Sequence, residues 1–268
     1  MKKVFLGCMI ITAFLMLLSG GMVAMQEKTI FYQMTYQTEN VTGQLLVNGF
    51  VITEFDGKTG NGSAALNPWL IGDNEIKADI KKANPSKPSE FSFGVSEMER
   101  GATVSTTDKG KLISIELKNK DFGADGKATS AKKFKSILDF KKHLSDAGRA
   151  NEKDVYAYAQ KLYAMFAKKD TESILRESEI KVIDYSKAFG GVDMKSELRR
   201  FLTEELFRAK LNKLNPASLR AVAVGPTKRI WHIFNGKEEL IQAKSSDGST
   251  FDLAVYVGMI NGKLKIVR

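Results

Sequence analysis

The spacing of apolar residues changes near the middle of the chain, and this change constrains the fold more than any other feature. In the first half, apolar side chains alternate with polar ones, as at Ile30, Tyr32, Met34 and Tyr36. After Asn151 they recur every three or four positions, at Val155, Tyr158, Ala159, Leu162 and Phe166. Period two is typical of half-buried strands, and a period near 3.6 of amphipathic helices. The pattern therefore predicts two domains, one all-β and one that begins with helices.

Short alternating runs separated by turn sequences fill the first half. Further runs are centred on Ile76, Ala78 and Ile80 and on Ile113, Ile115 and Leu117. The segments VNGF (47–50), DGKTGNGS (56–63) and NPSKPS (84–89) are turn or loop sequences. Several short strands with this spacing predict an all-β antiparallel sandwich over residues 26–146.

The segment LNPWLIGDNEIKADI (66–80) contains a proline-aromatic turn and a Gly-Asp-Asn turn before an alternating strand. It resembles a stretch found in many immunoglobulin-like and jelly-roll accessory domains. Trp69 within it is a candidate contact for a glycan or a protein partner. The competing interpretation is that Trp69 covers one end of the sandwich.

Residues 127–151 have two interpretations. The run KKFKSILDFKKHL (132–144) fits a strand with Phe134, Leu138 and Phe140 on one face, or a basic amphipathic helix. We favour a last strand followed by a linker, because SDAGRA (145–150) is typical of a break. The domain boundary is then expected near residue 147, with the second domain at residues 151–268.

Three helices and then strands are expected in the second domain. Asn151 and Asp154 form a capping pair, Asp170 or Thr171 caps a second helix, and Gly190-Gly191 ends it. A third helix runs from about Met194 to the stop at Asn215-Pro216. Strands follow at 219–224, 229–234, 239–244, 251–260 and 264–267, with Asn-Gly turns at 235–236 and 261–262. The second domain is thus expected to be α+β, with a curved antiparallel sheet.

The first 25 residues have the pattern of a secretory signal peptide. Lys2 and Lys3 precede an uncharged run of 21 residues, Val4–Ala24, with small residues near its end. That length also reaches the roughly 20 residues that span a bilayer, so an uncleaved inner-membrane anchor is the alternative. We expect an exported, periplasmic protein.

Charge and cysteine content limit the chemistry of the exported chain. The single cysteine, Cys8, lies in the leader, so disulfides, cysteine nucleophiles and cysteine-bound zinc are excluded after cleavage. Residues 151–268 carry 21 basic and 15 acidic side chains, whereas residues 25–150 carry 18 and 16. A basic surplus outside the cytoplasm favours an anionic surface over nucleic acid, for which no arginine-rich tract is present. The alternative interpretation of this surplus is a solvated basic face without a binding role.

The second half resembles the nuclear-transport-factor-2-like superfamily. The likeness lies in YAQKLYAMFAKKDTESIL (158–175), a helix, a Lys-Asp break and a second helix, and in the closing hairpin YVGMINGKLKIVR (256–268). It implies a cone-shaped α+β fold whose concavity serves ligand binding, catalysis of isomerase or dehydratase type, or packing against a partner. Fold alone does not choose among these uses.

The segment RIWHIFNG (229–236) carries most of the candidate ligand-binding residues. Strand parity places Arg229, Trp231 and Ile233 on one face and Ile230, His232 and Phe234 on the other. Either His232 lines the concavity as a possible base, or Arg229 and Trp231 line it and suit an anionic or aromatic ligand. A hydrogen-bonded core position is the alternative for each. Tyr158 and Tyr256 complete the set of candidate ligand-binding residues.

Catalytic and cofactor motifs are missing from the sequence. The acids Asp184, Glu239 and Asp252 form no pattern of a tuned pair, and the two histidines, His143 and His232, are about 90 positions apart. No HExxH, EF-hand loop, GxxxxGK or GxSxG occurs. We therefore expect no metal, no cofactor and no catalytic residue.

Three functional hypotheses follow. The first is a non-catalytic binding or protein-interaction protein of the bacterial cell envelope, which engages a protein partner or a small ligand. The second is a small-molecule enzyme that works in the cavity of the second domain through His232 or Tyr158. The third is a membrane-surface component that uses the basic second half.

Overall fold

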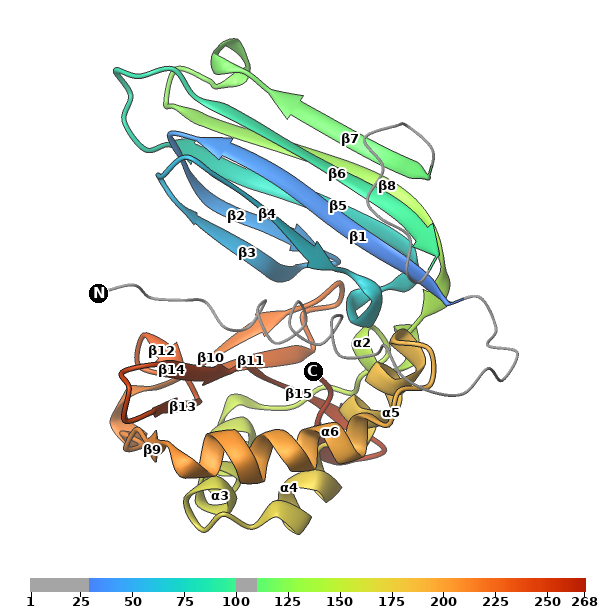
Figure 1. The fold of residues 1–268 in the computed structure, drawn as a ribbon, viewed down its shortest axis with the longest axis vertical. Coiled ribbons are helices and arrows are strands. Elements are labelled where there is room, and N and C mark those ends of the chain that lie inside the picture. Colours follow the sequence, from blue (N-terminus) through green and yellow to red (C-terminus); the bar gives the residue numbers. More distant parts are fainter. Residues whose placement is uncertain (1–28, 100–109) are drawn as a thin grey trace. The chain divides into compact units, whose positions relative to one another are not determined.

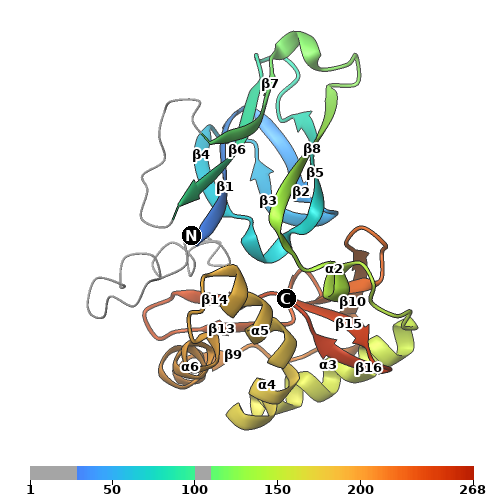
Figure 2. The same ribbon diagram turned by 90° about the vertical axis from the view of Figure 1, so that its right-hand side faces the viewer.

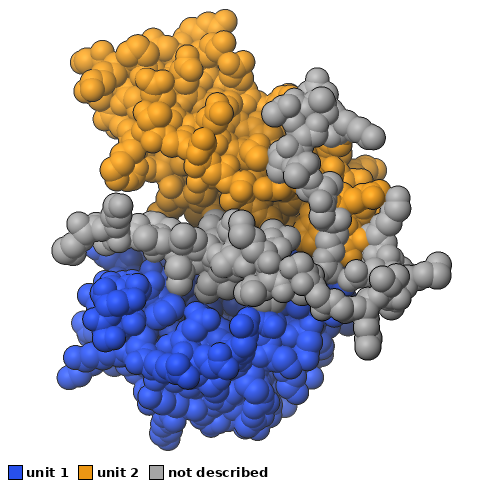
Figure 3. Space-filling model, in the orientation of Figure 1, with its two compact units in different colours: residues 1–22, 142–268 blue, residues 23–141 orange. Residues whose placement is uncertain are grey.

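A computed structural model describes residues 29–99 and 110–268. These residues fall into two compact units, 29–141 and 142–268, which Figure 3 colours separately. The chain passes from one unit to the other between Lys141 and Lys142. Residues 142–146, predicted to belong to the sandwich, and the expected linker 147–150 therefore belong to the second unit. Within the described part, no helix is long and apolar enough to cross a membrane.

The first unit consists of two antiparallel four-stranded sheets. The order β4-β1-β6-β7 makes one sheet and β3-β2-β5-β8 the other, as Figures 1 and 2 show. The strands are β1 (Ile30–Glu39), β2 (Val41–Val47), β3 (Phe50–Asp56), β4 (Gly60–Ala65), β5 (Ile71–Lys82), β6 (Glu90–Glu99), β7 (Lys111–Leu117) and β8 (Lys127–Asp139). The expected antiparallel β-rich first half is confirmed, and residues 127–139 are a strand rather than a helix.

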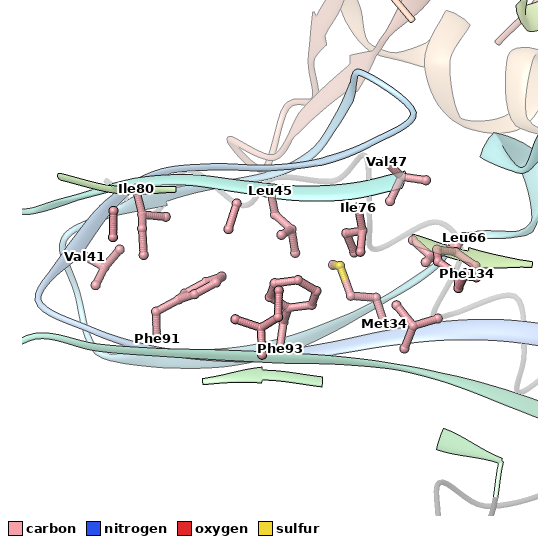
Figure 4. Close-up of a cluster of buried hydrophobic side chains, with 14 of the residues drawn as sticks. Met34, Val41, Leu45, Val47, Leu66, Ile76, Ile80, Phe91, Phe93 and Phe134 are labelled. Carbon is pink, nitrogen blue, oxygen red and sulfur yellow. The ribbon is translucent and has the colours of Figure 1, made fainter. Parts of the chain in front are cut away.

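Inward side chains from both sheets form one core. Met34 from β1 and Phe91 and Phe93 from β6 face Leu45 and Ile76 from β2 and β5, as Figure 4 shows. Successive strand residues point to opposite faces, so the alternation seen in the sequence is the alternation between this core and solvent. Burial of the apolar area between the sheets is the main stabilising contribution.

Buried asparagines close one end of the sandwich. Asn67 accepts a hydrogen bond from the Tyr32 N–H at 2.7 Å and donates to the Ile30 carbonyl at 2.9 Å. Asn48 donates to the Trp69 carbonyl at 2.8 Å and to Asn74 Oδ1 at 2.9 Å. These amides satisfy backbone groups that the sheet ladders leave unpaired, which buried polar groups require.

The second unit begins with helices. They are α2 (Lys141–Leu144), α3 (Glu152–Ala167), α4 (Thr171–Glu177), α5 (Glu179–Ala188) and α6 (Met194–Arg200), and α6 continues through a π-helical turn, Phe201–Glu205. The Asn151 side chain caps α3 by accepting from the Asp154 N–H at 2.8 Å, and Asp170 caps α4, both as expected. Gly190 and Gly191 follow α5 with φ of 72° and 81°.

The expected second helix is two helices. Buried Ser178 separates α4 from α5. The apolar residues predicted to line one face of a single helix, Leu175, Val182, Tyr185 and Phe189, therefore belong to two elements. α4 places Ile174 in the core, whereas α5 buries Asp184 and Ala188. The prediction of one continuous helix was wrong because Leu175 before the break and Val182, Tyr185 and Phe189 after it keep a helical spacing, so the apolar pattern does not mark the break.

The strands that follow form two antiparallel sheets. One has the order β10-β11-β15-β16, with β12 paired to β11, and the other has the order β14-β13-β9. Their bounds are β9 (Lys210–Leu211), β10 (Leu219–Val224), β11 (Ile230–Asn235), β12 (Glu238–Glu239), β13 (Ile241–Lys244), β14 (Thr250–Leu253), β15 (Val255–Ile260) and β16 (Lys263–Ile266). Helices followed by antiparallel strands were expected, but as one meander.

Two kinks divide that meander. The run 239–244 breaks at Leu240 and the run 251–260 breaks at Ala254. Leu240 and Ile241 are consecutive and both lie in the core, which one regular strand cannot achieve because its side chains alternate. The chain therefore bends at these points and passes from one sheet to the other.

Candidate functional site

Strand β11 divides the candidate residues of the second unit between two environments. Trp231 and Ile233 pack on the apolar cluster that α3, α4 and the sheets share. His232 and Phe234 lie on the opposite face of the sheet. Of the two arrangements open from the sequence, the structure has the Trp231 set against the helices. Arg229 donates from Nη1 to the Ala147 carbonyl at 3.2 Å, so it anchors the chain that follows α2.

We define the outer-face cluster as Arg220, His232, Phe234, Glu239 and Tyr256. His232 Nε2 lies 2.8 Å from Glu239 Oε2. The imidazole ring stacks on the Tyr256 ring at a centroid distance of 4.2 Å and lies 4.0 Å from the Phe234 ring. The Arg220 guanidinium lies 4.3 Å from the centre of the Phe234 ring.

Cross-strand register brings this cluster together. His232 is opposite Tyr256 on β15, and Phe234 is opposite Arg220 on β10 and Glu239 on β12. The histidine–carboxylate pair was missed because Glu239 lies beyond a turn, and only the β11/β12 pairing brings it back to His232. Two of the predicted residues, His232 and Tyr256, are therefore in direct contact. Arg229 contacts Ala147, and Trp231 packs on the apolar cluster of the helices.

A second histidine–carboxylate pair lies at α5. His143 Nδ1 is 3.0 and 2.9 Å from the two Asp184 carboxylate oxygens, and Arg268 Nη1 donates to Asp184 Oδ2 at 2.7 Å. Asp184 is 2% exposed and Arg268 1% exposed. Burial lowers the pKa of Arg268, and the Asp184 charge opposes that shift. This ion-paired triad joins α2, α5 and the chain after β16, and it was not predicted because its members come from three distant segments.

Lys181 and Tyr185 of α5 lie near the same charges. Burial lowers the pKa of Lys181 to about 8, Arg268 lowers it further, and Glu239 raises it. Lys181 Nζ lies 5.6 Å from the centre of the Tyr185 ring. Burial also raises the pKa of Tyr185. The pKa of Lys181 is therefore affected both by Glu239 of the outer-face cluster and by the Arg268 charge of the triad.

Tyr158 is an interior residue of α3. Its hydroxyl donates to Glu177 Oε2 at 2.9 Å, and Lys265 Nζ lies 3.3 Å from the same oxygen. Burial, followed by the negative charge of Glu177, raises the pKa of the Tyr158 phenol well above its usual value. Tyr158 keeps its proton and holds Glu177 in place, so it is unsuited to act as a base.

Side chains fill the space between the helices and the sheets. A cavity there has a volume of about 10 Å³, close to the room that one water molecule needs. Its lining is mostly apolar and comprises Phe166, Ile174, Ser178, Lys181, Leu198, Leu253, Ala254, Val255 and Ile266. A ligand pocket usually measures several hundred Å³. This cavity cannot hold a substrate.

Trp69 lies in the first unit, in the short turn Asn67–Trp69 that precedes β5. Its ring centroid is 5.1 Å from that of Phe50, and the side chain is partly buried against the sandwich core. This is the packing expected of a residue that covers the end of a sandwich.

Metal ligands do not gather in the part of the chain that the structure describes, where no three His, Cys, Asp or Glu side chains are placed to hold an ion. Comparison of the chain with protein-family models, with curated proteins and with solved structures gives no match.

Proposed function

We propose that the chain is an exported, non-catalytic binding or protein-interaction protein of the bacterial cell envelope. In this proposal residues 1–25 are the export signal, the first unit is an immunoglobulin-like or jelly-roll accessory domain, and the second is a nuclear-transport-factor-2-like cone. The order of helices and antiparallel strands supports the last assignment. The basic surplus of residues 151–268 is compatible with an anionic partner.

One observation carries the proposal: side chains fill the interior of the second unit, where a cone-shaped fold would have its concavity. The apolar side chains of α3, α4 and the two sheets meet there and leave about 10 Å³. A buried enzyme site needs room for substrate beside its catalytic groups. Because that space is occupied, we expect the outer surfaces of the units to bind the partner.

Enzymatic activity is the second candidate, favoured by the His232–Glu239 pair. A carboxylate that holds one imidazole nitrogen orients the ring and its tautomer, as general bases require. However, the His232 ring lies between two aromatic rings and is 9% exposed, which fits a satisfied structural histidine equally well. The interaction proposal needs no turnover from this pair.

Photo-cross-linking in the host cell tests the proposal. A cross-linking residue replaces Ile137 in the first unit or Ile183 in the second, because these side chains are 73% and 44% exposed. We expect a saturable complex with one envelope component that purified components reproduce and that His232→Gln leaves intact. Turnover of a small molecule that His232→Gln abolishes, with no complex from either position, would establish the enzyme instead.

A further inference from the structure

The two sheets of the first unit differ in the charge of their outer faces. Strand β5 points five charged side chains away from the core: Asp73, Glu75, Lys77, Asp79 and Lys81. Strands β1 and β6, at the centre of the other sheet, point uncharged residues outward: Gln33, Thr35 and Gln37 on β1, and Ser92, Gly94 and Ser96 on β6. Charges are therefore dense on one sheet and absent from the centre of the other.

We define the uncharged face as these six residues of β1 and β6 together with Asn61 and Ser63 of β4. Cross-strand pairing places Asn61 opposite Gln37 and Ser63 opposite Thr35, so the eight residues are contiguous. Half-buried Phe31 and Met98, which are opposite each other, continue the face at one end. Charged side chains border the face at its other end and on β7, at Glu39, Glu90, Lys111 and Glu116.

Gly94 lies at the centre of this face, in the interior of β6. Its φ is outside the left-handed region, and a Cβ there would meet only the Ile113 carbonyl oxygen, at an ordinary contact distance of 3.4 Å. The bulge between β6 and β7 places its extra residue, Leu112, in β7. The backbone therefore does not require glycine, which weakens a strand. A glycine of this kind is typical of a place where a ligand approaches the strand closely.

The side chains around Gly94 can both donate and accept hydrogen bonds. Within residues 29–99 and 110–268, the side chains of Gln33, Thr35 and Gln37 form no hydrogen bond with one another or with their neighbours. Thr35 and Gln37 are exposed. Each amide has donor and acceptor groups, and each hydroxyl serves as either. These properties match a ligand whose own groups are uncharged and also do both.

The size of the uncharged face argues against a protein partner. From Phe31 to Gln37 and across four strands, the face measures about 20 by 15 Å, or roughly 300 Å². Stable protein interfaces bury about 800 Å² on each partner, and serine is depleted in them. A second copy of the chain, stacked face to face, would bury too little area. A strongly charged partner would find no opposite charges at the centre of the face.

We infer that the uncharged face of the first unit binds a neutral glycan, laid across Gly94 between the amides of β1 and the hydroxyls of β4 and β6. Sugar hydroxyls both donate and accept, as the side chains of Gln33, Thr35 and Gln37 do. The apolar C–H face of a sugar ring would pack on Phe31 and Met98. The inference rests on the proposed binding function and names the class of ligand that the first unit takes.

Titration of the full exported chain with soluble oligosaccharides tests this site. The probes are neutral oligomers of glucose and of N-acetylglucosamine, and acidic oligomers of galacturonic acid are the comparison. Gly94→Val fills the centre of the face with a residue that strands favour. Gln33→Ala removes one amide and serves if Gly94→Val does not fold. The matched controls, Ala131→Val and Gln44→Ala, make the same kinds of change on the outer face of the other sheet.

We expect a neutral oligosaccharide to bind the parent and both controls alike, and its affinity to fall about tenfold in Gly94→Val and in Gln33→Ala. The acidic oligomers should bind more weakly. Three results would overturn the site: no neutral oligosaccharide bound at about 1 mM, equal binding to all variants, or acidic oligomers bound as tightly as neutral ones.

The same titration separates this inference from the proposed function. Absence of glycan binding, together with a cross-linked complex with the envelope component, would refute the glycan site alone. Shortening of a bound oligosaccharide by the parent, but not by His232→Gln, would refute the non-catalytic function and leave the glycan site standing. Mass spectrometry of the recovered oligosaccharide distinguishes binding from cleavage.

Discussion

The two units bury polar groups of different kinds. Residues 29–141 bury neutral amides, with Asn48, Asn67 and Asn74 at one end of the sandwich. Residues 142–268 bury charges: Asp184 of α5 is paired with Arg268. An amide replaces missing backbone partners at modest cost, whereas a buried ion is tolerated only while its counter-ion is present. The first unit should therefore withstand single substitutions and shifts of pH better than the second.

The largest effect should follow removal of Asp184. In Asp184→Ala the Arg268 guanidinium stays buried but has lost the Asp184 carboxylate. Removal of one partner of a buried ion pair typically lowers the free energy of unfolding by about 3–5 kcal/mol. Hydrogen exchange followed by mass spectrometry measures this destabilisation, because the loss of protection should be confined to residues 142–268. The matched control His143→Gln leaves the Asp184–Arg268 pair in place and should cost less. An equal loss of protection in both variants would show that the Asp184–Arg268 pair does not itself determine stability.

A smaller effect is expected from the amide network. Asn67→Ala removes the acceptor of the Tyr32 N–H and the donor to the Ile30 carbonyl, and an unsatisfied buried group costs about 1–3 kcal/mol. Urea unfolding measures the change, and Asn84→Ala, in an exposed loop, is the control. The contrast between the units fails if Asn67→Ala destabilises the chain more than Asp184→Ala does.

A third expected effect is a dependence on pH. The pKa of Lys181 is lowered from 10.5 to about 8 in the folded chain, so between these values the unfolded chain binds more protons. Stability should therefore rise as pH increases from about 8 towards 10. Above 10 the phenol of Tyr158 opposes this gain, because its pKa is raised on folding. In Lys181→Met, the stability of residues 142–268 should rise less steeply with pH. A pH dependence as steep as that of the parent would show that Lys181 is solvated.

Much of the fold follows from periodicity and turns. Alternation identifies β1, β5 and β7, the Asn48-Gly49 turn joins β2 to β3, and Asn151 starts α3 as its capping pattern predicts. Local signals suffice in these places because the relevant partners lie a few residues away. The break at Ser178 and the kinks at Leu240 and Ala254 could not be predicted, because tertiary packing decides them.

The candidate site was less accessible from the sequence. Strand parity separates His232 from Trp231 correctly, but it does not say which set faces the helices. The partners Glu239 and Asp184 reach their histidines only through the β11/β12 pairing and through the packing of α5.

In the proposed function, the second unit recognises partners on its surface and has no ligand space inside. Methyl-resolved NMR of Ile174, Leu198 and Ile266, which line the internal cavity, tests it during a screen of small aromatic and carboxylate compounds. We predict that these three methyl signals stay unmoved at every compound concentration. Saturable displacement of all three by one compound would show that the interior opens to a ligand, and would contradict the account.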